Sequence, residues 1–265
     1  MFDNNVRTEA IPERVLELCK IVSSKAISED EVREFVEPAA LSIGSSPYYP
    51  IVRDAAIEIG LIEKTDQSLQ FIGDKSSIKS LETFRYYCNS VVWKDETTFF
   101  YKIGQLFLQA DDNWFGENIT SSVVLSKMRE RISNSVNEPM LLGERFWLSF
   151  LGFGYVHESQ KIVFLPNMYI AMKDFINMCE FEKNKEYSVR EFISAICEYS
   201  KVAFEGVYET KQLNLAVSNA LRQLDKNKEI VLKRNSDSKE IWNLYKLESL
   251  TTTEITHILF KGLKK

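Results

Sequence analysis

The sequence predicts a mainly α-helical protein with small β-hairpins, an α+β fold built from winged-helix-like units in tandem. Amphipathic runs with helical spacing recur throughout the 265 residues, and pairs of short apolar strands follow some of them. The order helix, helix, helix, hairpin occurs three times. We therefore expect three units: residues 1–75, residues 76–180 with a bridging helix, and residues 181–265.

The first expected unit begins with an amphipathic helix that Pro12 opens. Residues 28–31, Ser-Glu-Asp-Glu, have the capping-box pattern that starts a second helix. A third helix is expected to start at Ser46, as N-cap before a proline, and to end at Gly60. Residues 61–72 then form two partly apolar stretches around a polar turn, which indicates a hairpin.

The second expected unit repeats this order after a bridging helix over residues 81–92. Its helices are predicted near residues 96–110, 121–133 and 141–151. Gly154-Tyr155-Val156-His157 resembles Gly60-Leu61-Ile62-Glu63, a glycine, two apolar residues and a polar one. This correspondence predicts that a hairpin follows the third helix, as in the first unit.

The third expected unit starts with another capping box at residues 188–191. Thr210 precedes a long amphipathic helix. Residues 229–233 and 241–244 are expected to pair as a hairpin around a polar turn, and residues 251–254 to cap a short final helix that contains His257.

Composition restricts the class of protein. Hydrophobic residues make up 45% of the chain and only ten glycines are present, which favours globular units. No run approaches the roughly 20 apolar residues that span a membrane, and the polar N-terminus lacks the apolar core of a secretory signal. The four cysteines are scattered, with no CxxC pair, so a reducing cytoplasm is the expected location.

No catalytic pattern is recognisable. The two histidines lie far apart in the sequence, and HExxH, GxSxG, Walker and GxGxxG motifs are absent. Asp111 and Asp112, close to Trp114 and Glu117, suit a magnesium-dependent phosphodiesterase only if further ligands and a base are present, and none is evident. An exposed loop explains them better, so we predict no enzyme activity, metal or cofactor.

Charge is distributed unevenly along the chain. Residues 1–75 hold 8 Lys and Arg against 14 Asp and Glu, a net charge of −6. Residues 76–180 hold 10 against 12, a net of −2, and residues 181–265 hold 15 against 12, a net of +3. Phosphate binding depends on local cations, so DNA contact is expected toward the C-terminus, and the acidic N-terminal unit is expected to meet protein.

A winged helix reads DNA with its third helix, which then needs Arg, Lys, Asn or Gln on its outer face. In the first unit that helix offers only Arg53 beside acidic residues, and in the second it offers Arg145 beside Glu144. Elsewhere in the second unit, a small basic cluster of Lys127, Arg129 and Arg131 could touch phosphate. The third unit is the best candidate, with DNA contact expected within residues 205–245. Its nominated residues are Lys211, Gln212, Asn219, Arg222, Lys233, Arg234 and Lys239.

Three stretches carry a resemblance to a known family: EFVEPAALS at residues 34–42, DDNWFGENIT at residues 111–120 and RFWLSFLGFGY at residues 145–155. With the short N-terminal helix, they resemble the DpdG-like accessory proteins of bacterial clusters that insert 7-deazaguanine derivatives into DNA. The resemblance covers about half of the chain, and the third unit matches only in its winged-helix outline. It implies a defence-associated, DNA-directed accessory protein and transfers no site residue.

Two functions remain open from the sequence. The first is a non-catalytic, DNA-associated accessory protein of a prokaryotic defence or DNA-modification system. The second is a protein-interaction scaffold without direct DNA binding, since winged helices also bind proteins and the whole chain has a net charge of −5.

Overall fold

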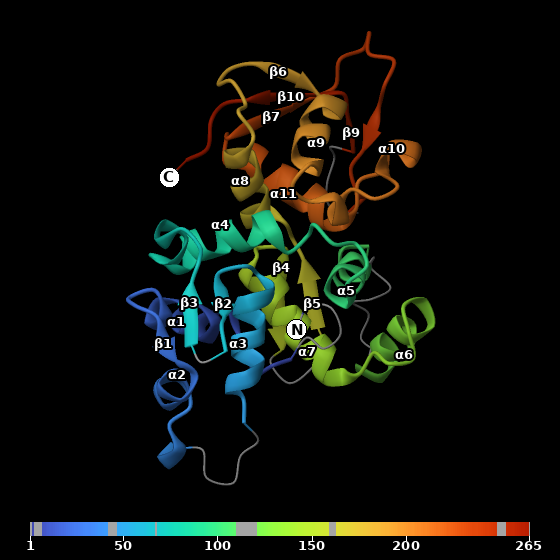
Figure 1. Cartoon of the computed structure of the whole chain (residues 1–265). Helices are drawn as coiled ribbons and strands as arrows, with labels where there is room; N and C mark the ends of the chain where they lie inside the picture. The colour runs from blue at the N-terminus through green and yellow to red at the C-terminus, as the bar shows by residue number, and fades with distance from the viewer. Residues whose placement is uncertain are drawn as a thin grey trace. The chain divides into compact units, whose positions relative to one another are not determined.

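The computed structural model describes residues 2, 7–41, 47–66, 68–109, 121–158, 163–247 and 253–264. It contains helices and small antiparallel sheets, which confirms the mainly α prediction with small β-hairpins (Figure 1). No helix of the described residues is long and apolar enough to cross a membrane.

The chain divides into two compact units. Unit 1 comprises residues 1–103 and 125–150, and unit 2 comprises residues 104–124 and 151–265. The division falls within helices α5 (Phe99–Leu108) and α6 (Ser121–Arg131). The three ranges expected from the sequence were defined by a recurring order of helices and strands. The two units are defined by how densely residues contact one another, so they do not test the three ranges, which stay a prediction.

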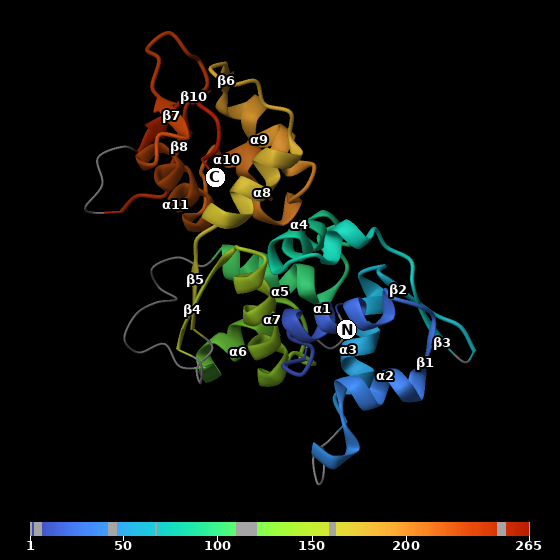
Figure 2. The same cartoon turned by 90° about the vertical axis from the view of Figure 1, so that its left-hand side faces the viewer.

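Unit 1 contains a winged-helix-like arrangement in its N-terminal part (Figure 2). Its three strands form an antiparallel sheet in the order β1-β3-β2, so the last strand lies in the middle. Ile27 pairs with Leu69 on one side of that strand, and Ile62 pairs with Phe71 on the other. The elements are α1 (Pro12–Val22), β1 (Ile27–Ser28), α2 (Glu29–Val36), the 3-10 helix η1 (Ala39–Leu41), α3 (Tyr49–Glu58), β2 (Ile62–Lys64) and β3 (Ser68–Phe71).

Helix α1 provides the centre of the core of unit 1. Its apolar face, which includes Leu16 and Cys19, is buried and packs against α2, α3 and β3. Trp147 is fully buried and donates a hydrogen bond from its indole nitrogen to the carbonyl of Ala10 at 2.8 Å. The remaining helices are the 3-10 helix η2 (Lys75–Ile78), α4 (Leu81–Val91) and α7 (Glu138–Phe150). Helix α4 confirms the helix predicted over residues 81–92, and its bridging role stays a prediction.

Unit 2 contains a second winged-helix-like arrangement, in which strands β6, β10 and β7 form the sheet in that order. The elements of this unit are β4 (Gly154–Glu158), β5 (Val163–Pro166), α8 (Tyr169–Met178), β6 (Glu186–Ser188), α9 (Val189–Cys197), the 3-10 helix η4 (Lys201–Ala203), α10 (Val207–Thr210), α11 (Leu215–Lys226), β7 (Ile230–Lys233), β8 (Trp242–Asn243), β9 (Glu254–Ile255) and β10 (His257–Phe260).

The two arrangements share one order of principal elements. In each, a helix is followed by a short strand, two further helices and two strands of the same sheet, and the last of these strands pairs with both others. Unit 2 adds the short helix α10 and the strands β8 and β9 to this order. The capping serine is also shared. Ser28 ends β1 and caps α2 by accepting from the Glu31 amide, and Ser188 ends β6 and caps α9 by accepting from the Glu191 amide. The capping serine is thus confirmed at both positions, and the full reciprocal capping box is formed at Ser188 and Glu191.

The predicted hairpin of the third unit is wrong. Strand β7 pairs with β10, with Leu232 opposite Ile258, rather than with residues 241–244. Residues 242–243 instead form β8, which pairs with β9. The predicted final helix is also wrong, since His257 begins β10. The local pattern predicted the wrong partner because β10, the strand that pairs with β7, follows only after a long connection.

Three helices, each followed by a strand, end in the same way. Helices α3, α7 and α11 end at residues 58, 150 and 226. Two residues later stand Gly60 with φ 75°, Gly152 with φ 83° and Lys228 with φ 60°. The left-handed turn caps the helix and redirects the chain into the following strand. Gly152 is therefore the equivalent of Gly60, and the predicted equivalence of Gly154, the first residue of β4, is wrong by two positions.

Two other helix starts differ from prediction. Helix α3 begins at Tyr49 rather than Pro47, and the carboxylate of Glu37, 3% exposed, accepts hydrogen bonds from the amides of Tyr48 and Tyr49 at 3.1 and 3.0 Å. Helix α11 begins at Leu215, capped by the side chain of Asn214. Ser46 lies outside the described residues.

The shared turn allows a paired stability test. Left-handed backbone costs an L-residue roughly 1–2 kcal/mol relative to glycine. Replacement Gly60→Ala should therefore lower the free energy of unfolding by about 1 kcal/mol, whereas Lys228→Gly should leave it unchanged or raise it. Urea unfolding of both variants checks this. A loss of stability in Lys228→Gly equal to that in Gly60→Ala would contradict the assignment of the turn.

Helix α7 buries an isolated carboxyl group. Glu144 is 0% exposed, and neither of its side-chain oxygens has a hydrogen-bond partner among the described residues. Burial raises the pKa of Glu144 well above its ordinary value of 4.5, because the low-dielectric core disfavours the charged form. The native state therefore keeps this proton at a pH where the unfolded chain has released it.

Glu144 should make unit 1 less stable as pH rises. The folded pKa is raised, so stability is present below about pH 4.5 and is lost as pH rises toward the folded pKa, by about 1.4 kcal/mol per pH unit within that window. Glu144→Gln should abolish this slope, and Glu144→Met should also raise stability at neutral pH. Urea unfolding between pH 5 and pH 8 measures the slope. An identical slope in wild type and Glu144→Gln would contradict the assignment.

Candidate interaction surfaces of unit 2

The residues nominated for DNA contact all lie in unit 2. They occupy the segments before and within α11, the end of β7 and the connection that follows it. We call residues 234–247, the described first part of the connection between β7 and β10, the wing segment. Lys211 and Gln212 precede α11, Asn219 and Arg222 lie on it, Lys233 ends β7, and Arg234 and Lys239 belong to the wing segment.

Lys211 takes part in a cluster with the wing segment. Its Nζ lies 2.8 Å from Oε1 of Glu240 and 4.7 Å from the centre of the Trp242 ring. Arg190 of α9 binds the same carboxylate at 2.6 Å. The two cations, Arg190 first, lower the pKa of Glu240 to about 2. Glu240 thus holds the wing segment to Arg190 and Lys211, and these two cations share its single negative charge.

The two basic residues at the end of β7 also have acidic partners. Lys233 forms an ion pair with Glu186 of β6, and hydrogen bonding to Lys233 lowers the pKa of Glu186. Arg234 Nε lies 3.2 Å from Glu254 of β9. Both pairs are partly exposed, so they contribute little stability, but each places a negative charge beside the cation that DNA would need.

The outer side of α11 is covered by the wing segment. Arg222 donates to the carbonyl of Tyr245 at 2.7 Å, and the Tyr245 amide donates to the Ser218 hydroxyl at 2.8 Å. Asn219 is half-buried, and Lys226 is the one exposed residue of this helix. The Gln212 side chain donates to the carbonyl of Asn243 at 3.4 Å. Helix α11 therefore offers little free surface to a DNA groove.

Lys239 differs from the other nominated cations. It is exposed and makes no ion pair with any residue that the structure describes. Lys226 and Lys228 are exposed too. The structure thus brings together Lys211, Gln212 and Arg222 with the wing segment as parts of the fold, and leaves Lys239 to solvent.

The other sequence candidates divide in the same way. Arg53 on α3 forms ion pairs with Glu29 and Asp54. On α6, Arg129 donates to the carbonyl of Val136 at 2.8 Å, and Arg131 is exposed. The acidic stretch 111–120 lies outside the described residues.

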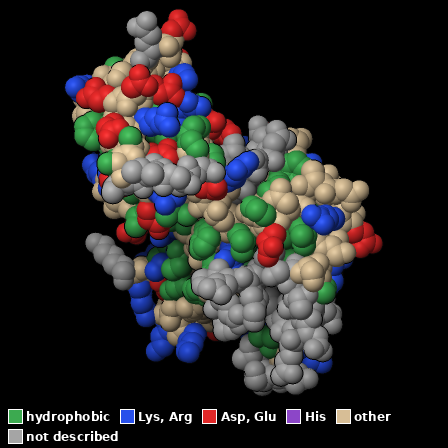
Figure 3. Space-filling model, turned by 90° about the horizontal axis from the view of Figure 1, so that it is seen from below, with side chains coloured by type: hydrophobic (Ala, Val, Ile, Leu, Met, Phe, Trp, Pro, Cys, Tyr) green, Lys and Arg blue, Asp and Glu red, His purple; other side chains and the backbone are tan. Residues whose placement is uncertain are grey.

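Both signs of charge are mixed on the visible surface as well. In the face that Figure 3 shows, Lys and Arg side chains stand among Asp and Glu side chains at the upper left of the view. A protein that tracks the DNA backbone needs cations free of such neighbours.

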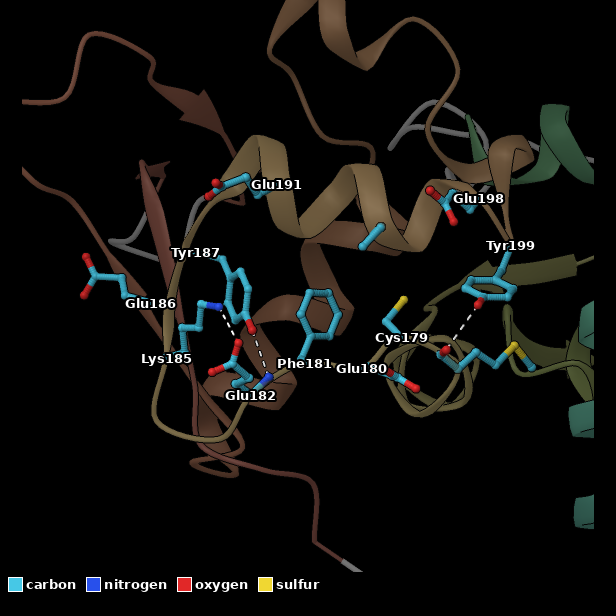
Figure 4. A pocket seen from close by; sticks show the side chains of 12 residues that line it. Cys179, Glu180, Phe181, Glu182, Lys185, Glu186, Tyr187, Glu191, Glu198 and Tyr199 are labelled. Carbon is cyan, nitrogen blue, oxygen red and sulfur yellow. Dashed lines mark hydrogen bonds and ion pairs between the residues drawn. The ribbon is translucent and has the colours of Figure 1, made fainter.

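Unit 2 also has an open groove that the sequence did not predict. Its volume is about 600 Å³, and it lies between the end of α8, strand β6 and one side of α9 (Figure 4). Residues 178–182 and 185–187 form most of the lining, and residues of α9 with Glu198 and Tyr199 complete it. The lining residues are Met178, Cys179, Glu180, Phe181, Glu182, Lys185, Glu186, Tyr187, Glu191, Ala195, Glu198 and Tyr199.

The groove has an aromatic and an acidic character. Phe181 stacks on buried Phe192 of α9, with ring centres 4.6 Å apart and planes 17° apart. Five glutamates and one lysine are among the lining residues.

Burial raises the pKa of the Cys179 thiol to about 11, and the nearby Glu198 carboxylate adds to that rise. Cys179 is thus a protonated, weakly nucleophilic thiol at neutral pH. The sequence signal was the stretch CEFEKNKE at residues 179–186, which alternates acidic and other side chains.

Among the described side chains, no group of three or more His, Cys, Asp or Glu is arranged to hold a metal ion. The prediction that the chain has no metal or cofactor stays a prediction. Comparisons with protein-family models, with curated proteins and with solved structures found no match.

Replacement Glu240→Gln should loosen the wing segment. The folded pKa of Glu240 is lowered, so its contribution is present above about pH 4.5 and is lost as pH falls toward 2. The exposed setting limits that contribution to about 1 kcal/mol or less. Glu240→Gln should therefore be less stable than wild type at pH 7, equally stable near pH 2, and cleaved faster by trypsin after Lys239.

Asp237→Asn is the matched control, because it removes the same charge from the wing segment where the described residues show no ion pair. Equal trypsin cleavage in Glu240→Gln and Asp237→Asn would contradict the role of Glu240.

Proposed function

We propose that this chain is a non-catalytic interaction module that binds a protein partner rather than nucleic acid. The observation that carries the proposal is the pairing of three nominated cations with acidic residues of unit 2: Lys233 and Arg234 each have a carboxylate partner, and Lys211 shares that of Glu240 with Arg190. DNA binding gains its free energy from cations that replace counterions on phosphate. If these three cations bound phosphate, their carboxylate partners would remain next to the phosphate and repel it.

The covered α11 supports the same proposal. A winged helix that reads base edges inserts its third helix into the major groove. In unit 2 the hydrogen bonds of Tyr245 to Arg222 and Ser218 hold the wing segment against α11, and Lys226 is the one exposed residue of that helix. The resemblance to defence-associated accessory proteins is compatible with a protein-binding role inside a larger DNA-directed assembly.

DNA binding is the second candidate, and one observation favours it. Both compact units contain the element order and sheet order of a winged helix, and Lys226, Lys228 and Lys239 are exposed at one unit. Under this alternative, contact within residues 205–245 would be through phosphate, with the DNA-directed accessory role that the resemblance implies.

A duplex DNA titration separates the two candidates. Fluorescence anisotropy is measured at two salt concentrations, one of them about 0.15 M, where non-specific affinities for DNA are already weak. The wild-type chain should show no DNA binding that changes with salt. The variant Glu186→Gln, Glu240→Gln and Glu254→Gln, which frees the cations, should gain binding. Tight wild-type binding that Lys233→Glu, Arg234→Glu and Lys239→Glu abolish would overturn the proposal in favour of DNA.

Cross-linking in the native cells tests the protein partner. The tagged full chain should yield cross-links between unit 2 and another protein, and these should survive nuclease treatment of the extract. Cross-links that disappear after nuclease treatment would show association through nucleic acid and would contradict the proposal.

A further inference from the structure

The groove of unit 2 can be assigned a type of occupant. We propose that it binds a cationic segment of a partner protein, with a Lys or Arg side chain seated between Glu180 and Glu198. This inference rests on the proposed function and specifies the partner's chemistry. It draws on the shape of the groove, the fixed positions of its aromatic walls and the charge that its lining leaves unmatched.

The walls of the groove are held in place by contacts within unit 2. The Glu182 amide donates to the Tyr187 hydroxyl at 2.8 Å, and the Tyr199 hydroxyl donates to the carbonyl of Met178 at 3.1 Å (Figure 4). Phe181 is fixed between the Tyr187 ring, at 5.0 Å, and Phe192. A preformed groove lowers the cost of ordering on binding, which is the condition under which a short segment gains affinity.

Three of the five glutamates are already engaged. Glu182 forms an ion pair with Lys185 at 2.5 Å, Glu186 pairs with Lys233, and Glu191 accepts from Ser188 at the start of α9. These carboxylates stabilise the loop, the sheet and the helix start. They therefore contribute a negative field to the groove while their hydrogen-bonding positions are largely occupied.

Glu180 and Glu198 are the two that remain. Both are exposed, and neither forms an ion pair with a described residue. They lie at the end of the groove that Cys179 and Tyr199 line (Figure 4). Their charge is therefore available to an occupant, and the occupant that complements it is positive.

The aromatic walls narrow the choice further. Arginine and lysine side chains combine an apolar stem with a charge that interacts favourably with the faces of Tyr and Phe rings. Lys185 already makes such a contact within the groove, with its Nζ 5.3 Å from the centre of the Tyr187 ring. Tyr199 supplies a further ring at the end of the groove where Glu180 and Glu198 lie. Nucleic acid is disfavoured because its phosphates would meet the glutamates. Lys264 lies at another part of unit 2, where its amide donates to Glu229 at 2.8 Å.

Peptide binding to the full chain tests the inference. The probe is a fluorescein-labelled peptide of alternating arginine and leucine, compared with one in which glutamate replaces arginine. Wild type should bind only the arginine peptide, more weakly at high salt. Glu180→Gln with Glu198→Gln should raise Kd by about tenfold, the change that 1.4 kcal/mol produces. Ala195→Phe, which fills the groove without changing charge, should weaken binding as well.

The control is Glu209→Gln with Asp237→Asn, which removes two exposed charges of unit 2 outside the groove lining. This control should bind like wild type, and circular dichroism should show every variant folded. Equal affinity of the Glu180/Glu198 variant and the control would overturn the inference. So would self-association of the wild type that the Glu180/Glu198 variant abolishes, because the occupant would then be a second copy. Neither result depends on the DNA titration, so failure of the groove and failure of the proposed function are distinguishable.

Discussion

The pairing of β10 between β6 and β7 is the constraint on which the surface of unit 2 depends. It places the strand that comes last in sequence at the centre of the sheet, opposite Tyr187 on one side and Leu232 on the other. The described part of the connection between β7 and β10 contacts helices α9 and α11, through Glu240 and Tyr245 respectively. Glu186 is brought within reach of Lys233 across the central strand, and the connection carries Glu240 and Tyr245 to their partners.

The same constraint determines which chemistry the unit presents. A simple hairpin after α11 would leave a basic tip and a polar helix face, which is the surface of a DNA reader. The observed connection instead covers α11 and supplies carboxylates to the cations, while the loop between α8 and β6 forms an aromatic groove with unmatched negative charge. Charge complementarity then favours a basic protein segment as the partner.

Local signals in the sequence predicted the parts of the fold that local forces determine. The Ser28 and Ser188 caps and the turn at Gly60 depend on neighbouring residues, and each was found where expected. The partner of β7 depends on residues far along the chain, so the sequence pointed to the wrong strand. Charge counts placed the cations of the third unit but could not show that Glu186 and Glu240 neutralise them, because those pairs exist only after the sheet has formed. The groove was missed for the same reason.

Nuclear magnetic resonance of the labelled full chain tests the central pairing most directly. The account predicts backbone nuclear Overhauser contacts from Ile258 to both Tyr187 and Leu232, since that residue faces each of them in the sheet. Contacts between residues 230–233 and 241–244, with none from Ile258 to Tyr187, would contradict it.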